Sequence, residues 1–220
     1  MTETQAAAVA LSGQAQEFFH GLWASLFYTP QAPPKSVLIC SPNADEGATT
    51  IACGLAISGA SPAERSRAIL VDFNLRRPGL HERLDLADGV GASDVVIGAS
   101  SLDEALQRVE PGPLDVLTAG SRCDRWLEIL RTDRVQQLLG ELQNRYDQVI
   151  LDVAPVNQYP DAQILSELVA GAVLVAHCGR TSREALLAAR QRLETGAGKV
   201  LGVVLNMRTY PIPGFLYRRV

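Results

Sequence analysis

Residues 36–50 read SVLICSPNADEGATT. The first five residues form a short apolar run, which predicts a buried β-strand. A helix is expected over residues 49–60, so that a strand, a tight loop and the start of a helix follow one another directly. In that arrangement the backbone N–H groups of the loop and the dipole of the helix favour an anion. The segment therefore predicts a phosphate-binding loop.

The end of this loop differs from a working phosphate loop at one position. A working loop ends in Gly-Lys-Ser/Thr, whereas this chain has Gly47, Ala48 and Thr49. The Thr49 hydroxyl that would hold Mg²⁺ is kept, but the lysine is lost, at a cost of about 1.5–3 kcal/mol, or about ten- to a hundredfold in affinity. A carboxylate at Asp45 adds repulsion if it faces the phosphates. The alternative interpretation is that Thr49 and Thr50 simply begin a helix after an ordinary turn.

The alternation of apolar strands and amphipathic helices continues along the chain. Further strands are expected at residues 68–73, 114–118, 148–153, 172–178 and 200–206. Further helices are expected at residues 14–28, 93–97, 102–109, 125–146 (where an interruption near Thr132 is left open), 161–169 and 182–195. This order predicts an α/β fold, a mostly parallel sheet with helices on both faces, of the P-loop NTPase type. In such sheets ligands bind beyond the carboxyl ends of the strands.

Length and composition are those of one globular domain. The 220 residues are 47% hydrophobic and 20% charged. The predicted parts are an N-terminal helix with a Pro-rich linker (1–35), the α/β domain (36–207) and a C-terminal tail (208–220). The net charge of −4 argues against nucleic acid as a partner. The sequence has no signal-peptide pattern and no long apolar run, so we expect a cytoplasmic chain without direct membrane insertion.

The four cysteines are widely spaced and show no zinc-binding pattern. Cys40, Cys53 and Cys178 lie in apolar segments. We therefore expect all three to be core residues in a reducing compartment.

Two further segments, taken with the loop, resemble a known family. Residues 69–81 read ILVDFNLRRPGLH, and residues 149–156 read VILDVAPV. The three segments together resemble the bacterial tyrosine autokinases (BY-kinases) of capsule and exopolysaccharide synthesis, which are related to cell-division and partitioning ATPases with deviant Walker motifs. The family pattern is S-P-x-P-G-E-G-K-S/T-T, then D-x-D-x-R-x-P-x-x-H, then I-I-D-T-P-P. The resemblance covers about residues 15–207.

The resemblance implies roles for four further side chains in a vestigial nucleotide site. Asp72 and Asp152, with Thr49, occupy the positions that serve Mg²⁺ when a nucleotide binds. Asn74 replaces the second aspartate of the family's middle motif, which removes a candidate base. Asn206, at the end of the last strand, is placed to meet an adenine. The alternative interpretation gives the two aspartates the role of caps or loop ties, and gives Asn206 that of satisfying nearby backbone.

The family's early helix carries the pattern E-x-x-R-x-x-R, which is implicated in a ring-shaped oligomer. The same spacing here gives Glu17, His20 and Trp23, so pairing through arginines would be lost. Phe18, Phe19 and Trp23 either form an apolar contact in a homo-oligomer or belong to the core. Both interpretations remain open at this point.

Two main hypotheses for function follow from the resemblance. The first is a catalytically impaired BY-kinase-like protein, which binds MgATP or MgADP weakly if at all. It would regulate or scaffold polysaccharide export, with the cytoplasmic segment of a membrane polysaccharide co-polymerase or a kinase paralogue as partner. That partner would recruit the chain to the inner face of the membrane. Tyr210 and Tyr217 replace the family's tyrosine cluster and are interpreted as packing residues.

The second hypothesis is an active ATP-dependent tyrosine kinase or ATPase. Another cation, from Arg76, Arg77 or Arg180, would then replace the lysine. A third class, a partitioning ATPase acting on DNA or membrane, is disfavoured because the chain has neither a basic surface signature nor a terminal basic amphipathic helix.

Overall fold

The computed structural model describes residues 13–29, 31–60, 66–109, 114–121, 126–130 and 133–209. Cys123 and the two tail tyrosines, Tyr210 and Tyr217, lie outside the described residues, as do most of the residues of the predicted C-terminal tail.

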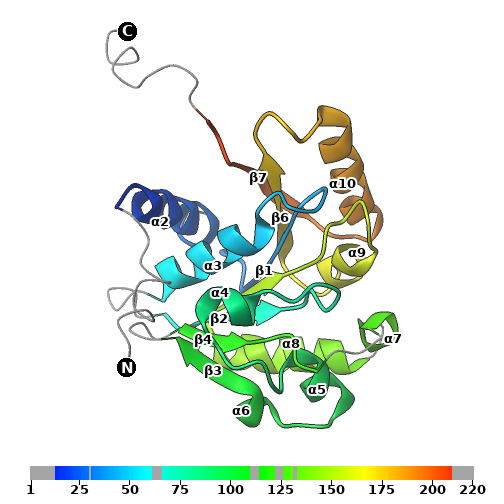
Figure 1. Ribbon diagram of the computed structural model, residues 1–220. Helices are drawn as coiled ribbons and strands as arrows, with labels where there is room; N and C mark the ends of the chain where they lie inside the picture. The colour runs from blue at the N-terminus through cyan, green and yellow to red at the C-terminus, as the bar shows by residue number, and fades with distance from the viewer. Residues whose placement is uncertain are drawn as a thin grey trace, which may run out of the picture.

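A seven-stranded sheet forms the centre of the molecule, in the order β3-β4-β2-β5-β1-β6-β7 (Figure 1). Its strands are β1 (Ser36–Cys40), β2 (Ala68–Asp72), β3 (Leu106–Val109), β4 (Leu114–Leu117), β5 (Gln148–Asp152), β6 (Gly171–His177) and β7 (Val200–Asn206). All neighbouring pairs are parallel except β3 and β4, which are antiparallel. The predicted α/β fold with a mostly parallel sheet is confirmed.

Helices cover both faces of this sheet (Figure 1). On one face lie α2 (Gly13–Phe27), α3 (Ala48–Gly59) and α4 (Leu80–Leu84). On the other lie α5 (Ala92–Ile97), α6 (Leu102–Ala105), α7 (Trp126–Leu130), α8 (Asp133–Arg145), α9 (Asp161–Ser166) and α10 (Arg183–Thr195). Side chains of β1 alternate between the two cores, so the whole strand is buried. This double burial explains why the central strands read as continuous apolar runs.

Helix α2 packs against α3 through aromatic side chains. Phe19 and Trp23 are 5% and 2% exposed, and they lie over Gly54 and Gly59 of α3. A Cβ atom at Gly59 would lie 2.0 Å from the indole ring of Trp23, so the close approach of the two helices requires glycine there. Phe19 and Trp23 are therefore core residues, whereas Phe18 is 46% exposed.

The prediction of a helix over residues 102–109 is wrong in its second half. The helix α6 stops at Ala105, and the next four residues form β3, which pairs antiparallel with β4 at the edge of the sheet. The start of α6 has a strong capping signal, because Ser101 and Glu104 bond each other's backbone N–H groups. That signal predicts where the helix begins but not where it ends.

The region 125–146 contains two helices, α7 and α8, on either side of residues 131–132, which agrees with the interruption expected near Thr132; residues 131–132 are not among the described residues. One other helical prediction needs correction. Helix α9 ends at Ser166 rather than at residue 169. The reason is that the Ala170 N–H donates to the Ser36 carbonyl (3.1 Å), which draws the chain toward β6. The short helix α4 was not predicted.

Cys40 and Cys53 are buried as predicted, and Cys178 is partly exposed, contrary to the prediction. Burial raises the pKa of the Cys40 and Cys53 thiols well above the ordinary value, so both stay neutral at physiological pH. None of the helices in the described ranges combines the length and the apolar character that crossing a bilayer requires.

Candidate functional site

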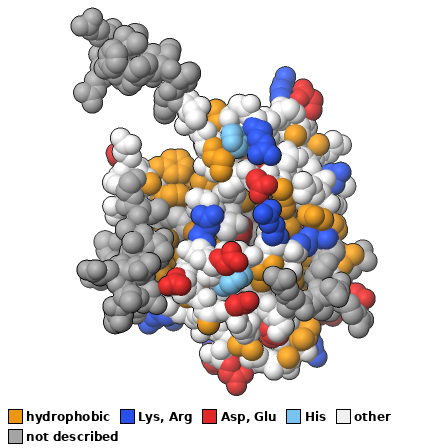
Figure 2. All heavy atoms as spheres, viewed as in Figure 1, with side chains coloured by type: hydrophobic (Ala, Val, Ile, Leu, Met, Phe, Trp, Pro, Cys, Tyr) orange, Lys and Arg blue, Asp and Glu red, His pale blue; other side chains and the backbone are white. Residues whose placement is uncertain are grey.

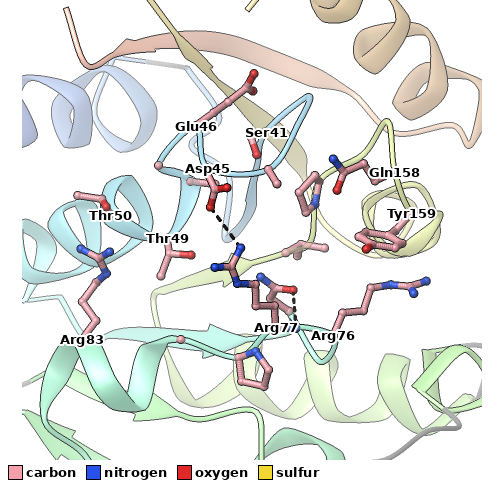
Figure 3. A pocket seen from close by; sticks show the side chains of 18 of the residues that line it. Ser41, Asp45, Glu46, Thr49, Thr50, Arg76, Arg77, Arg83, Gln158 and Tyr159 are labelled. Carbon is pink, nitrogen blue, oxygen red and sulfur yellow. Dashed lines mark hydrogen bonds and ion pairs between the residues drawn. The ribbon is translucent and has the colours of Figure 1, made fainter. Parts of the chain in front are cut away.

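A cavity of about 820 Å³ opens at the carboxyl ends of β1, β2 and β5. Its walls come from the loop after β1 and the start of α3, from the segment between β2 and α4, and from the loop after β5 (Figure 3). Basic and acidic side chains gather around the middle of this face in the space-filling view (Figure 2). The three segments singled out in the sequence therefore meet in one pocket, at the edge of the sheet where ligands bind in this fold class.

The loop enters α3 through a left-handed glycine. Gly47 has φ 90° and ψ 25°, and its carbonyl accepts the first helical hydrogen bond from Ile51 N (3.1 Å). A Cβ atom at Gly47 would lie 2.1 Å from Nδ2 of Asn206, so both conformation and space require glycine. Ala48, Thr49 and the next residue, Thr50, all line the cavity.

Hydrogen bonds to Glu46 stabilise the shape of the loop. The sequence analysis did not single out this residue. Its side chain is 1% exposed and accepts hydrogen bonds from the Asn43 backbone (3.1 Å), the Asn43 amide (3.0 Å) and the Thr181 hydroxyl (2.7 Å). The Asn206 amide donates to the Glu46 carbonyl (3.0 Å). In this structure Asn206 therefore satisfies loop backbone, as the alternative interpretation held.

Asp72 and Asp152 lie side by side at the ends of β2 and β5, where they are register partners. Both are buried, at 0% and 1% exposure. Asp72 accepts hydrogen bonds from the backbone N–H groups of Asn74 (3.0 Å), Gly79 (3.1 Å) and Leu80 (3.2 Å). Asp72 therefore caps the start of α4 and ties down the loop before it.

Asp152 differs from its neighbour because no backbone N–H group among the described residues donates to it, and the Thr49 hydroxyl is the donor that acts on its carboxylate. Burial and then the charge of Asp72 raise the pKa of Asp152 to about 8, although the Thr49 hydroxyl and the charge of Arg83 oppose that rise. Burial also raises the pKa of Asp72, against the effect of its three backbone donors. A buried carboxylate without backbone donors favours a cation or a proton, so Asp152 is not a structural cap.

The residues fit a magnesium ion that arrives with a nucleotide. In phosphate sites Mg²⁺ takes one or two carboxylates and completes its shell with water and phosphate oxygens. Asp152, Thr49 and Asp72 would supply such ligands, although of the three only Thr49 lines the cavity and both aspartates lie buried beneath it. The described residues contain no group of three or more acidic, His or Cys side chains that would hold a metal alone. Phosphate oxygens would therefore have to share the ion.

The two arginines of the middle motif that line the pocket are paired. Arg76 makes a bidentate ion pair with Asp161 (2.8 and 3.1 Å) and lies 3.8 Å from the centre of the Tyr159 ring. Arg77 pairs with Asp45 at 3.2 Å. Arg180, the third arginine considered from the sequence, is not among the residues that line this cavity. Arg83, which was not considered, does line it.

A left-handed glycine between a buried strand and a helix, beside two buried aspartates on neighbouring strands, defines a domain of the P-loop NTPase type. The septum site-determining protein MinD of Pyrococcus horikoshii, solved with Mg-ADP, has the same fold. Its TM-score is 0.65 at 20% identity, over 84% of this chain and 76% of that chain.

Closer relatives show the family. The chain is 36% identical to the tyrosine-protein kinase YwqD of Bacillus subtilis over 172 residues, which cover 78% of this chain and 72% of YwqD. The chain belongs to the bacterial tyrosine-kinase (BY-kinase) family. No protein-family model matches the sequence.

Two other relatives and one solved structure agree with that assignment. The putative tyrosine-protein kinase CapB of Staphylococcus aureus is 27% identical over 191 residues, which cover 86% of this chain and 83% of CapB. The succinoglycan biosynthesis transport protein ExoP of Rhizobium meliloti is 28% identical over 175 residues, but the match covers only 22% of ExoP. The crystal structure of the chimerical protein CapA2B2 has a TM-score of 0.83 at 28% identity, over 88% of this chain and 85% of that chain.

Proposed function

We propose that this chain is a catalytically impaired BY-kinase family member, a regulatory or scaffolding partner in bacterial exopolysaccharide or capsule biosynthesis and export. The observation that carries the proposal is Ala48, whose methyl group stands where a lysine would reach the phosphates. Phosphoryl transfer depends almost entirely on positioning and charge neutralisation. Loss of the lysine therefore weakens catalysis more than it weakens binding.

Two other positions support the same proposal. Asn74 lines the pocket where the family pattern has an aspartate, and an amide cannot take the proton of an incoming tyrosine. Asp45 adds a carboxylate to the rim, and at about 5 Å it would repel a phosphate charge by about 3 kcal/mol at an effective dielectric of about 20. Pairing with Arg77 offsets part of that repulsion. We therefore propose weak binding of MgADP or MgATP rather than none.

The pathway and partner are proposed from the relatives. ExoP is named for succinoglycan biosynthesis transport, and this chain matches only part of it. We therefore propose the cytoplasmic segment of a membrane polysaccharide co-polymerase, or an active kinase paralogue, as the partner. Such a partner would hold the chain at the inner face of the membrane, alone or as a homo-oligomer.

A phosphotransfer assay tests the loss of activity. The native chain, an Asp152→Asn control and a revertant (Asp45→Gly, Ala48→Lys, Asn74→Asp) are incubated with MgATP carrying a labelled γ-phosphate and a tyrosine-containing acceptor peptide. We expect no more phosphotyrosine from the native chain than from the Asp152→Asn control, and a measurable amount from the revertant. Phosphotyrosine made by the native chain and lost in the control would overturn the proposal.

The second candidate function is an active tyrosine kinase or ATPase of the same pathway with a non-standard cation. The observation that favours it is the presence of Arg76, Arg77 and Arg83 on the wall of the pocket. Under this candidate the native chain hydrolyses MgATP, and removal of one of these arginines abolishes the hydrolysis. The assay above, read for ADP release, separates the two candidates.

A further inference from the structure

Two of the three arginines around the phosphate loop are held by acidic partners. The Arg76 guanidinium spans both oxygens of Asp161, a carboxylate whose side chain is 1% exposed, and it stacks on Tyr159. Moving Arg76 toward a ligand would leave Asp161 charged, buried and unpaired, which is costly. The Arg77 guanidinium is engaged by Asp45, so bringing Arg77 to a phosphate would release a negative charge on the rim of the same pocket.

The third arginine, Arg83, has a side chain with neither a hydrogen bond nor an ion pair among the described residues. It lines the same cavity, and its side chain extends from α4 toward Thr50 at the start of α3 (Figure 3). Arg83 therefore presents its charge to the cavity beside the start of α3, where the phosphate loop ends.

Asp72 positions the backbone of Arg83 through the start of α4. Asp72 accepts hydrogen bonds from Gly79 N and Leu80 N at the beginning of α4, and Arg83 N donates to the Gly79 carbonyl (3.2 Å) in the first turn. Leu80 and Leu84, on either side of Arg83, are buried in the core. The backbone of Arg83 is therefore anchored, while its side chain is exposed toward the pocket.

We propose that Arg83 replaces the missing lysine as the cation that binds the phosphate groups of a magnesium-bound adenine nucleotide. This inference rests on the proposed nucleotide site, but not on whether the chain transfers phosphate. Arginine suits the task because its planar guanidinium is always charged and can donate two parallel hydrogen bonds to a phosphate. Arg83 approaches from α4, across the pocket from the loop. It therefore supplies the positive charge that the lysine would have supplied, but from α4 and not from the loop.

The test is isothermal titration of the whole chain with MgADP, for native protein and for Arg83→Gln, Arg83→Lys and Arg180→Gln. We expect Arg83→Gln to weaken binding about ten- to a hundredfold, the range of one charge-assisted hydrogen bond. Arg83→Lys keeps the charge and should recover part of the affinity. Arg180→Gln removes an exposed arginine outside the cavity and should leave the affinity unchanged. The affinity for magnesium pyrophosphate, which lacks base and ribose, should fall by the same factor in Arg83→Gln.

A lysine restored to the loop provides the rescue. Ala48→Lys should raise the affinity of Arg83→Gln for MgADP by a larger factor than it raises that of the native chain. The reason is that the introduced lysine and Arg83 would bind the same phosphate groups, so their effects would not be additive. The inference is overturned if native protein binds no MgADP, if Arg83→Gln binds as tightly as native, or if only MgADP and not pyrophosphate is affected. The phosphotransfer assay on the same preparations decides the proposed loss of activity separately. If the native chain binds MgADP through Arg83 and also transfers phosphate, the proposed loss of activity is overturned and the role of Arg83 stands.

Discussion

The carboxylate of Asp45 lies 3.2 Å from Nη1 of Arg77, so an ion pair joins the phosphate loop to the segment after β2 across the rim of the pocket (Figure 3). Both side chains are exposed, at 66% and 79%, and such pairs contribute at most about 1 kcal/mol to stability. Asp45 also has φ 60°, a backbone conformation that glycine adopts more easily. The pair therefore matters for the charge of the pocket rather than for the fold.

Asp45→Gly should raise the affinity for MgADP about tenfold, because it removes a repelling carboxylate and releases Arg77. The melting temperature should change by no more than about 3 °C, because relief of the strained φ offsets the greater entropy of glycine in the unfolded chain. Titration calorimetry and thermal unfolding measure the two effects. Asp85→Gly is the matched control, since Asp85 has φ 53° and lies outside the pocket. An equal gain of affinity in the control would rule out the electrostatic explanation.

Asp152→Asn should remove a pH dependence of stability. The folded chain keeps the Asp152 proton up to a pKa of about 8, whereas the unfolded chain releases it near the ordinary value of 3.8. The free energy of unfolding therefore falls as the pH rises through that window. Above pH 8 the variant should melt about 3 °C or more above the native chain, and near pH 4 the difference should vanish. Addition of MgADP should stabilise the native chain but not the variant.

Asp94→Asn is a control for which the effect of pH on stability should run in the opposite direction. Burial raises the pKa of Asp94, but hydrogen bonds from Ser121 N and Gly91 N, both 2.9 Å, outweigh burial and hold the pKa below its ordinary value. Its charged form therefore stabilises the fold at neutral pH, and that contribution is lost as the pH falls through the lowered pKa. The variant should be less stable than the native chain at pH 7, with a smaller difference at pH 3. If both variants had the same pH profile, burial would not explain the Asp152 result.

Much of the fold could be predicted because the buried strands leave a strong local signal. The apolar run of β1 matches its observed bounds, and the bounds of β5 differ by a single residue. The edge strand β3 has no such run, since only one of its four residues is buried. Its antiparallel pairing with β4 is a hairpin between consecutive strands, which the capping signal at Ser101 does not reveal.

The site could be predicted only in part. Thr49, Asp72 and Asp152 lie at the ends of recognisable segments, and the sheet brings them together. The different environments of the two aspartates depend on the loop before α4, which folds back onto Asp72 and gives Asp152 no backbone donor. The contact between Glu46 and Thr181 joins residues far apart in the sequence, and no local pattern indicates it.

Gly47→Ala tests how the loop is held. A side chain at φ 90° costs about 1–2 kcal/mol, and displacement of the Asn206 amide costs the hydrogen bond to Glu46, about 1 kcal/mol more. We expect the melting temperature to fall by about 5–10 °C. Gly140→Ala is the matched control, because that glycine lies in α8 with open space around it. There, alanine should stabilise the chain by up to about 1 kcal/mol.

A double variant separates the two costs at Gly47. Asn206→Ala removes the side chain that a Cβ atom would meet at 2.1 Å. The combined loss in Gly47→Ala, Asn206→Ala should therefore be smaller than the sum of the single losses. Strict additivity would show that the backbone conformation alone, and not the contact with Asn206, excludes alanine.

Arg76→Ala should be strongly destabilising, because it leaves Asp161 without its bidentate partner at 1% exposure. Removing one member of a buried ion pair costs about 3–5 kcal/mol, whereas an exposed pair is worth at most about 1 kcal/mol. Arg108→Ala, which breaks an exposed edge-strand pair with Asp115, is the matched control. Urea unfolding should show a lower midpoint for Arg76→Ala with an unchanged slope.

The charge left on Asp161, rather than the lost packing of Arg76 on Tyr159, should account for most of that loss. Asp161→Asn in the Arg76→Ala background neutralises the buried group, so it should recover about half of the lost stability or more. If the double variant were as unstable as Arg76→Ala, packing against the ring would be the main contribution. Arg76 also lines the pocket. If most of the lost stability comes from the unpaired charge of Asp161, the ion pair with Asp161 explains why Arg76 is unavailable to a phosphate.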